Sequence, residues 1–481
     1  MISSSSLPKI SIFTMFRIGL YQMGLGMMSL LTLGVLNRIM IDELKVLPLL
    51  AAGAIATHQF VSPMRVWFGQ LSDTKPLFGL HRTGYVWCGS ILFTSISFVA
   101  LQVIWQLGST LQAQGWSVAT YGWSAILALV FGLYGLALSA SSTPFAAMLV
   151  DISDEDNRSQ LVGVVWSMLM VGIVAGAIIS SGLLNRPELC GDAIAQGGVV
   201  SDSAPANISQ LRASINPAFI KVPLIVLGLS FISTFGVEAK YSRFSERTQA
   251  VEREDQIRLK DALRVLTASR QTGVFFGFLL VLTISIFMQD AVLEPYGGEV
   301  FGLCISETTR LNIPFGVGTL LGIGGSGFFV LPRIGKKNAT RLGCLGAIAC
   351  FVAIIISGFT QNLSLLNAGL FGFGLCSGLI TAGATSLMLD LTAAETAGTF
   401  IGAWGLAQAM SRGLATVFGG GILNFSKTLF DSAAMAYSSV FIVQGIGMLL
   451  AVYCLQQVNI QEFKDNAQAA ISAVLANDIE G

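Results

Sequence analysis

Three observations in this sequence predict an all-α polytopic membrane protein. The chain of 481 residues is 53% hydrophobic and only 11% charged, with a mean hydropathy of +0.72. A water-soluble protein of this length cannot bury so much apolar surface, so the solvent must be lipid. Apolar runs near the roughly 20 residues that span a bilayer recur along the whole chain. Glycine is abundant, at 53 residues, and small residues inside such runs let helices pack closely.

Twelve runs are expected to be transmembrane helices. Their approximate ranges are 12–36, 46–68, 84–106, 122–146, 160–184, 217–237, 272–294, 308–331, 340–359, 364–388, 398–424 and 434–456. If the N-terminus is cytoplasmic, most of the 27 lysines and arginines fall in loops on that side, as the positive-inside rule expects. The sequence therefore predicts an integral membrane protein with both termini cytoplasmic.

A charged segment divides the chain in the middle. Residues 238–271 separate the sixth run from the seventh and are expected to form a cytoplasmic linker. From Glu252 to Arg270, apolar residues recur at helical spacing, which predicts an amphipathic helix on the membrane surface. The expected units are a six-helix half at 1–237, the linker at 238–271, a second six-helix half at 272–457 and a cytoplasmic tail at 458–481.

The two halves look like repeats. A shift of 239 residues pairs Asp151 with Asp390 and Asn185 with Asn424 at matching places in each half. Parallel six-helix repeats with a binding site between them are the plan of the major facilitator superfamily.

A loop after the second run resembles the same superfamily. Gly69 and Asp73, in the string GQLSD, are followed by Arg82, as in its cytoplasmic latch loop. The resemblance implies charges that bridge neighbouring helix ends. An insert at 74–81 departs from the usual pattern, so the individual latch partners do not carry over.

Two longer strings resemble one family within that superfamily. LNRIMIDEL at residues 36–44 follows the first run, and QDAVLEPYGGE at 289–299 closes the seventh. With GAWG at 402–405 and Arg412 in the eleventh run, they are similar to the PucC/LhaA family of chlorophyll and bacteriochlorophyll delivery proteins. The resemblance implies a transporter or delivery factor with bound pigment as its substrate. It also implies a role in assembling light-harvesting or photosystem complexes, in a thylakoid or a cell inner (plasma) membrane. The implied partners are nascent antenna or photosystem polypeptides and pigment-synthesis enzymes.

The same strings suggest an outer gate. A shift of 252 residues lays the first run on the seventh and aligns Asn37 with Gln289, Arg38 with Asp290, and Asp42 with Glu294. Helices one and seven of this superfamily face each other across the central cavity. We hypothesise that Arg38 with Asp290 or Glu294 forms a gate or a rigid tie between the halves. The alternative is that these are helix-end charges in water, with unrelated partners.

Arg412 is the main cavity candidate, because a cation within an apolar run needs an acceptor or water. It can contact a carboxylate or propionate of the substrate, pair with a cavity acid, or tie to a backbone carbonyl. Gln408, Trp404 and Tyr296 are further candidates. His58, at membrane depth, is either a packing histidine or a magnesium ligand for a pigment.

Several classes of function are disfavoured. Acidic and basic side chains balance at 27 each, so charge indicates no nucleic acid partner. The sequence has no P-loop and only two histidines, which argues against an enzyme. Seven cysteines without a CxxC pair argue against a metal or disulfide framework. Two alternatives to pigment delivery remain: a proton-coupled carrier of a small solute that uses Asp290 or Glu294, and a non-transporting assembly chaperone for antenna polypeptides.

Overall fold

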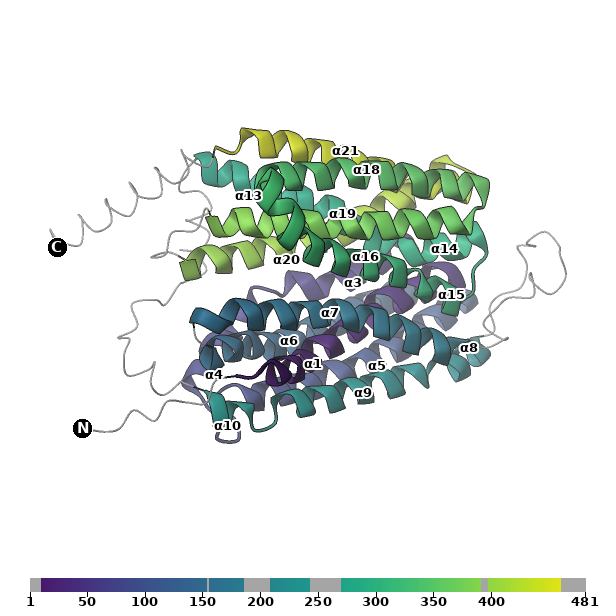
Figure 1. Ribbon diagram of the computed structural model, residues 1–481. Coiled ribbons are helices and arrows are strands. Elements are labelled where there is room, and N and C mark those ends of the chain that lie inside the picture. Colours follow the sequence, from purple (N-terminus) through teal and green to yellow (C-terminus); the bar gives the residue numbers. More distant parts are fainter. Residues whose placement is uncertain (1–9, 154, 186–207, 243–269, 391–396, 460–481) are drawn as a thin grey trace, which may run out of the picture.

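The computed structural model describes residues 10–153, 155–185, 208–242, 270–390 and 397–459. Nearly all of these residues lie in helices, and the long helices run side by side as one bundle (Figure 1). By length and composition, nine helices of the described part can cross a membrane. The predicted runs 46–68 and 308–331 also fall on helices, but each helix is interrupted. Helices are the expected form here, because a lipid-exposed backbone must satisfy its own hydrogen bonds.

The N-terminal half begins with one long, irregular span. It comprises α1 (Ile12–Ser29), η1 (Leu30–Val35), α2 (Leu36–Arg38) and η2 (Ile39–Glu43), of which η1 and η2 are π-helical. The remaining helices are α3 (Pro48–Phe60), α4 (Met64–Thr74), α5 (Thr83–Gln114), α6 (Val118–Ile152), α7 (Glu155–Leu184), α8 (Ile208–Ile215), α9 (Ala218–Thr234) and α10 (Val237–Tyr241). The break between α3 and α4 coincides with Pro63, which lacks a backbone donor.

The C-terminal half also contains a broken span. The first part is α13 (Arg270–Phe287), the 3₁₀ segment η4 (Met288–Ala291) and α14 (Leu293–Phe301). It continues with α15 (Ile305–Arg310), α16 (Asn312–Gly325), η5 (Ser326–Val330), α17 (Leu331–Ile334), α18 (Lys336–Thr360), α19 (Leu363–Asp390), α20 (Ala397–Leu429) and α21 (Ala433–Gln457). Helix α1 begins and α21 ends at the same end of the bundle, on the left in Figure 1.

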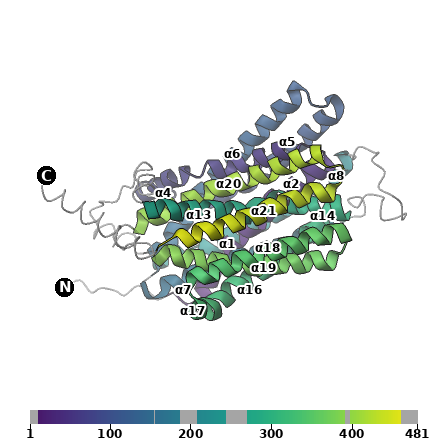
Figure 2. The same cartoon turned by 90° about the horizontal axis from the view of Figure 1, so that it is seen from above.

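The two halves lie one above the other in Figure 1 and have separate apolar cores. They meet mainly where α20 packs on α3 and where α16 and α15 pack on α7. Viewed from above, the far ends of α5 and α6 project beyond the bundle (Figure 2). Most of the predicted linker, including most of its surface helix, lies in 243–269, and most of the tail lies in 460–481. Both ranges are beyond what the structure describes, so the boundaries at 237, 271 and 457 stay predictions.

Glycines determine how closely the helices approach. Gly172 of α7 lies against the backbone carbonyl of Met23 in α1, and Gly26 of α1 lies against that of Leu169 in α7. A side chain at either position would overlap main-chain atoms. These contacts are the close helix packing that small residues permit in lipid.

Candidate functional site

The two family-like strings form the most irregular parts of their spans. Residues 36–44 include all of α2 and the π-helical η2, directly after the π-helical η1. Residues 289–299 contain the end of the 3₁₀ segment η4 and the start of α14, with a break at Val292. Local departures from α-helix are frequent at functional sites, and discontinuous helices build the binding sites of many transporters.

These irregular segments contact each other across the two halves. Asn37 Nδ2 donates to the backbone carbonyl of Ala291 at 2.6 Å. Glu294 packs its carboxylate against Gly34, and Gly298 lies directly beneath the side chains of Arg38 and Asp42. Spans one and seven therefore face one another, as the alignment of the two halves predicts.

Of the two partners predicted for Arg38, Glu294 interacts with it electrostatically, whereas its ion pairs are with other carboxylates. It forms ion pairs with Asp42 and, at 3.5 Å, with Glu43, and it donates to the carbonyl of Leu303 across the interface at 3.2 Å. The proposed Arg38–Asp290 pair is not formed. Asp42 lies one helical turn from Arg38 on the same face, so it is the nearer carboxylate.

Glu294 and Glu299 complete this outer group of charges. Glu294 accepts a hydrogen bond from Asn312 Nδ2 at 2.9 Å and interacts electrostatically with Arg38. Glu299 pairs with Lys427 Nζ at 2.6 Å and accepts from the Tyr437 hydroxyl at 3.1 Å. We call the set the outer cluster; its members are Asn37, Arg38, Asp42, Glu294, Glu299, Asn312, Lys427 and Tyr437. No sequence signal marks Asn312, Lys427 or Tyr437, because they come from other spans and lie in no recognisable motif.

The outer cluster is largely withdrawn from solvent. Asn37, Arg38 and Asp42 are 1%, 5% and 7% exposed, and Glu294 is 3% exposed. Gln289, aligned with Asn37 in the repeat, is also buried, at 2%. This end of the bundle, on the right in Figure 1, is therefore closed around polar side chains from both halves.

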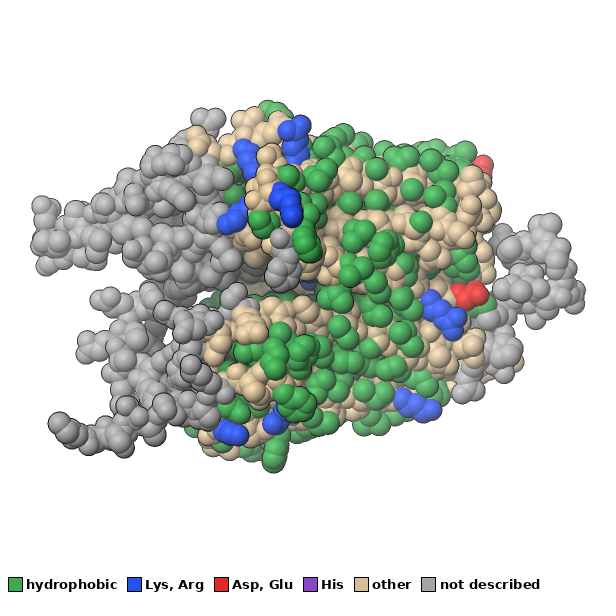
Figure 3. Space-filling view, viewed as in Figure 1, with side chains coloured by type: hydrophobic (Ala, Val, Ile, Leu, Met, Phe, Trp, Pro, Cys, Tyr) green, Lys and Arg blue, Asp and Glu red, His purple; other side chains and the backbone are tan. Residues whose placement is uncertain are grey.

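Asp290 is the exposed member of a largely buried segment. Its segment η4 packs against α20, α21 and η1, yet Asp290 is exposed while both of its sequence neighbours are buried. The charge that acts on it is Arg412 of α20, whose guanidinium stacks on the Phe287 ring at 3.9 Å from the centroid. Figure 3 shows the surface hollowed between the halves toward the end where α1 begins.

The other cavity candidates differ in position. Gln408 is half-buried on α20, and the side chain of Trp404 is beyond the described part. Tyr296 corrects a prediction: it does not line a cavity but is fully buried. It packs edge-on against Phe441 and donates to the Ile354 carbonyl at 2.8 Å. After the break before α14, the helix face that carries Tyr296 packs into the apolar core of the C-terminal half.

Both ring nitrogens of His58 are engaged within its own half. Nδ1 lies 2.5 Å from the Ile55 carbonyl oxygen and Nε2 lies 2.8 Å from Gln59 Nε2. The geometry fits Nδ1–H as donor and Nε2 as acceptor from the amide. This favours the packing histidine over the magnesium ligand. Among the described residues, no group of three His, Cys, Asp or Glu side chains can hold a metal ion.

The predicted latch loop forms a tie within the N-terminal half. Arg82 pairs with Asp73 at 2.6 Å and with Asp151 at 2.8 Å, and it donates to Ser72 Oγ at 2.6 Å. A β-carbon at Gly69 would make only an ordinary van der Waals contact, with Thr143. Although burial lowers the pKa of Arg82, the carboxylates of Asp151 and Asp73 raise it above its ordinary value, so this side chain stays cationic.

Arg82→Gln should loosen this junction measurably. The substitution removes charge-assisted hydrogen bonds worth about 1.5–3 kcal/mol each and leaves Asp151 buried without its cation. We expect a lower thermal midpoint in detergent, read as the fraction of monodisperse protein after heating. Arg341→Gln is the control, because Arg341 is exposed. Equal midpoints for the two variants would contradict the assignment.

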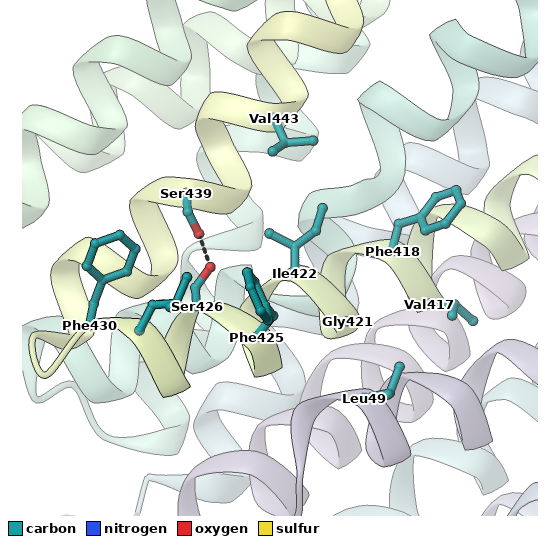
Figure 4. A pocket seen from close by; sticks show the side chains of 11 residues that line it. Leu49, Val417, Phe418, Gly421, Ile422, Phe425, Ser426, Phe430, Ser439 and Val443 are labelled. Atoms are coloured by element: carbon teal, nitrogen blue, oxygen red, sulfur yellow. Dashed lines mark hydrogen bonds between the residues drawn. The ribbon is translucent and has the colours of Figure 1, made fainter.

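A second cavity opens at the side of the C-terminal half. It has a volume of about 560 Å³ and lies between α20, α21 and the start of α3 (Figure 4). Its lining is apolar, with three phenylalanines, Phe418, Phe425 and Phe430; Ser426 and Ser439 point toward one another there at 2.5 Å. The shape and chemistry suit an apolar chain.

One expectation about the cysteines is also corrected. Cys304, which caps α15 at the closed end of the bundle, is disulfide-bonded. The absence of CxxC pairs excludes only short-range pairing, because two cysteines that are distant in sequence can meet in the fold. Its partner is not among the described residues.

Comparison with solved structures confirms the fold class. A bacterial homolog of the human lysosomal transporter Spinster, in an inward-facing and unoccupied conformation, superimposes with a TM-score of 0.66. The match covers 94% of this chain and 98% of that chain, at 13% identity. The likeness shows the fold alone, which is that of the major facilitator superfamily, and the chain is an integral membrane protein.

Sequence comparison extends over nearly the whole helical part. Protein PucC of Rhodobacter capsulatus is 28% identical over 449 residues, which cover 91% of this chain and 90% of that protein. The bacteriochlorophyll synthase 44.5 kDa chain of the same organism is 27% identical over 448 residues, covering 91% and 93%. The family model described as PUCC protein matches residues 35–463, so it includes both irregular segments and the outer cluster. This chain therefore belongs to the PUCC protein family.

Proposed function

We propose that this protein delivers chlorophyll or bacteriochlorophyll to light-harvesting or photosystem complexes while they are assembled, without itself catalysing a reaction. The observation that carries the proposal is the family match at residues 35–463 on a transporter fold, with a relative named for bacteriochlorophyll. The partners are nascent antenna or photosystem polypeptides and pigment-synthesis enzymes.

The geometry supports a cycle in which one end opens at a time. The outer cluster joins the halves at one end, Asp290 and Arg412 interact electrostatically within the bundle, and the surface is hollowed between the halves toward the other end. In this cycle the outer cluster is the gate, and its contacts between the halves, Asn37 to Ala291 and Arg38 to Leu303, break when that end opens. The apolar pocket beside α20 and α21 offers a lateral place for an isoprenoid chain.

The orientation belongs to the same proposal. Lysines and arginines of the loops are frequent at the end where α1 begins, which supports a cytoplasmic position for that end. The disulfide of Cys304 is at the opposite end, and disulfides persist in oxidising compartments outside the cytoplasm. Both termini are then cytoplasmic, in a thylakoid or a cell inner membrane.

The test is the pigment content of the protein taken from its own membrane. The tagged chain is purified in mild detergent, and its absorption spectrum and extractable pigment per chain are compared with those of an unrelated membrane protein. We expect stoichiometric pigment on the purified protein. The composition of this pigment should not change when the preparation is incubated, because no synthase activity is proposed. Pigment at the control level would contradict delivery.

The same preparation separates the alternatives. Antenna polypeptides that co-purify without pigment would indicate an assembly chaperone. If both are absent, pH-dependent solute uptake in vesicles that is lost in Asp290→Asn would indicate a proton-coupled carrier.

A further inference from the structure

Two arginines from opposite halves lie near each other inside the bundle. Arg65 is in the first turn of α4 and Arg412 is in α20. Arg412 interacts electrostatically with Arg65, and both cations act on His58. The helices that carry them are held in place because Gly413, next to Arg412, packs against the side chains of Gln59 and Phe60 of α3.

Both guanidinium groups have donors without acceptors. The Nε atoms of Arg65 and Arg412 are buried and make no hydrogen bond to any part of the chain that the structure describes. A buried donor without a partner is costly, and a charged one more so. Sequence inspection did not single out Arg65, although a cation two residues after Pro63 in an apolar run is the same signal that marks Arg412.

The local charge is unbalanced. Asp290 is the carboxylate that acts on Arg412, and the titratable side chain that stabilises the charged form of Arg65 is the phenol of Tyr21. Within the described part of the chain, the electrostatic partners of the two cations therefore include one carboxylate, Asp290. An additional anion would balance the positive charge and accept hydrogen bonds from the unpaired donors.

The chemistry of the missing anion follows from the side chains. A planar guanidinium binds a carboxylate through parallel hydrogen bonds, and two guanidinium groups can share one carboxylate. Phe287, beneath Arg412, places an aromatic face beside the charged site. The site thus fits a carboxylate attached to a large apolar body.

We propose that Arg65 and Arg412 form a carboxylate-binding site between the halves, and that its ligand is a macrocyclic pigment in the free-acid form. In that form the propionate is not yet esterified with an isoprenoid alcohol. The identity of the macrocycle rests on the proposed function, whereas the carboxylate site does not. The protein then takes its cargo before the esterifying reaction, or hands it to that reaction.

The test compares two probes that share a macrocycle and differ in whether the carboxylate is free and charged or methylated and neutral. Chlorophyllide a and its methyl ester are titrated into the full-length protein in detergent, and binding is followed by quenching of tryptophan fluorescence. We expect the acid to bind at least about tenfold more tightly than the ester, the size expected for a charge-assisted hydrogen bond. Arg65→Gln and Arg412→Gln should each abolish this preference while ester binding is retained.

Controls keep folding and function apart. Arg17→Gln removes an arginine that is bonded to the carbonyls of Ile232 and Phe235 at the α9 end and should keep the preference. If Arg412→Gln is not monodisperse, Arg412→Lys serves instead and should reduce the preference, because ammonium lacks the bidentate geometry.

Each outcome has a distinct meaning. Equal binding of acid and ester by every variant would overturn the carboxylate site and leave pigment delivery standing. Arginine-dependent binding of palmitate, with neither macrocycle bound, would keep the carboxylate site but overturn both the macrocyclic ligand and the proposed function. If chlorophyllide a, its methyl ester and palmitate all fail to bind, the inference is overturned altogether.

Discussion

Neutralising Arg38 alone should destabilise the protein more than neutralising Arg38 and Asp42 together. Both side chains are over 90% buried and form an ion pair within the outer cluster. Arg38→Gln leaves the Asp42 carboxylate buried without its cation, which costs about 3–5 kcal/mol, whereas the double variant Arg38→Gln/Asp42→Asn leaves no uncompensated buried charge from the pair. Thermal midpoints in detergent should fall in the order wild type, double variant, single variants.

The matched control is an arginine of the same half that is exposed to solvent. Arg212 of α8 donates to Gln102 Oε1 at 2.9 Å in an exposed position. Arg212→Gln should shift the midpoint little, since exposed pairs contribute about 0–1 kcal/mol. If the two single variants at Arg38 and Asp42 and their double all melt together, the idea that this pair acts as a buried unit fails.

Gly172→Leu should be the most disruptive change between α1 and α7. The position of a β-carbon is already occupied by the carbonyl of Met23, which is backbone and cannot rotate away. The cost should exceed the about 1–3 kcal/mol typical of overpacking, because the two helices must separate along their length. The expected result is little or no monodisperse protein after extraction from the membrane.

Gly182→Leu tests whether helix propensity or lack of space causes the loss expected for Gly172→Leu. Gly182 is on the same helix and has no atom near the position of its missing β-carbon. This variant should be as stable as the wild type, because Leu is the better helix former and faces lipid. Similar losses in both variants would show that α7 tolerates no leucine, whatever its packing.

The positions of the spans could be predicted well from hydropathy. The run expected at 434–456 is helix α21 at 433–457, and the run at 364–388 lies within α19 at 363–390. Lipid leaves a backbone few other forms, so twenty apolar residues imply a helix. The run at 46–68 was less well predicted, because Pro63 divides it into α3 and α4.

The candidate site was only half predictable. The strings at 36–44 and 289–299 stand out in the sequence, and they do meet in space. Their π-helical and 3₁₀ backbones could not be foreseen, because a π-bulge depends on what packs against it, here the Glu294 carboxylate against Gly34. The ion-pair partner of Arg38 could not be chosen from the sequence for a related reason. Repeat symmetry aligned Arg38 with Asp290 and left Glu294 as the alternative, whereas in the fold Arg38 interacts with Glu294 and forms its ion pair with Asp42, one helical turn away.

Sequence alone determined the class of solvent, the order of the helices and the family, since each is set by local composition or by contiguous strings. Tertiary structure alone decided which charges meet. It brought Lys427 to Glu299, Asn312 to Glu294, and Arg65 near Arg412, from segments far apart in the chain. Charge pairing depends on distances of a few ångströms and on the exclusion of water, and only the packed helices establish these.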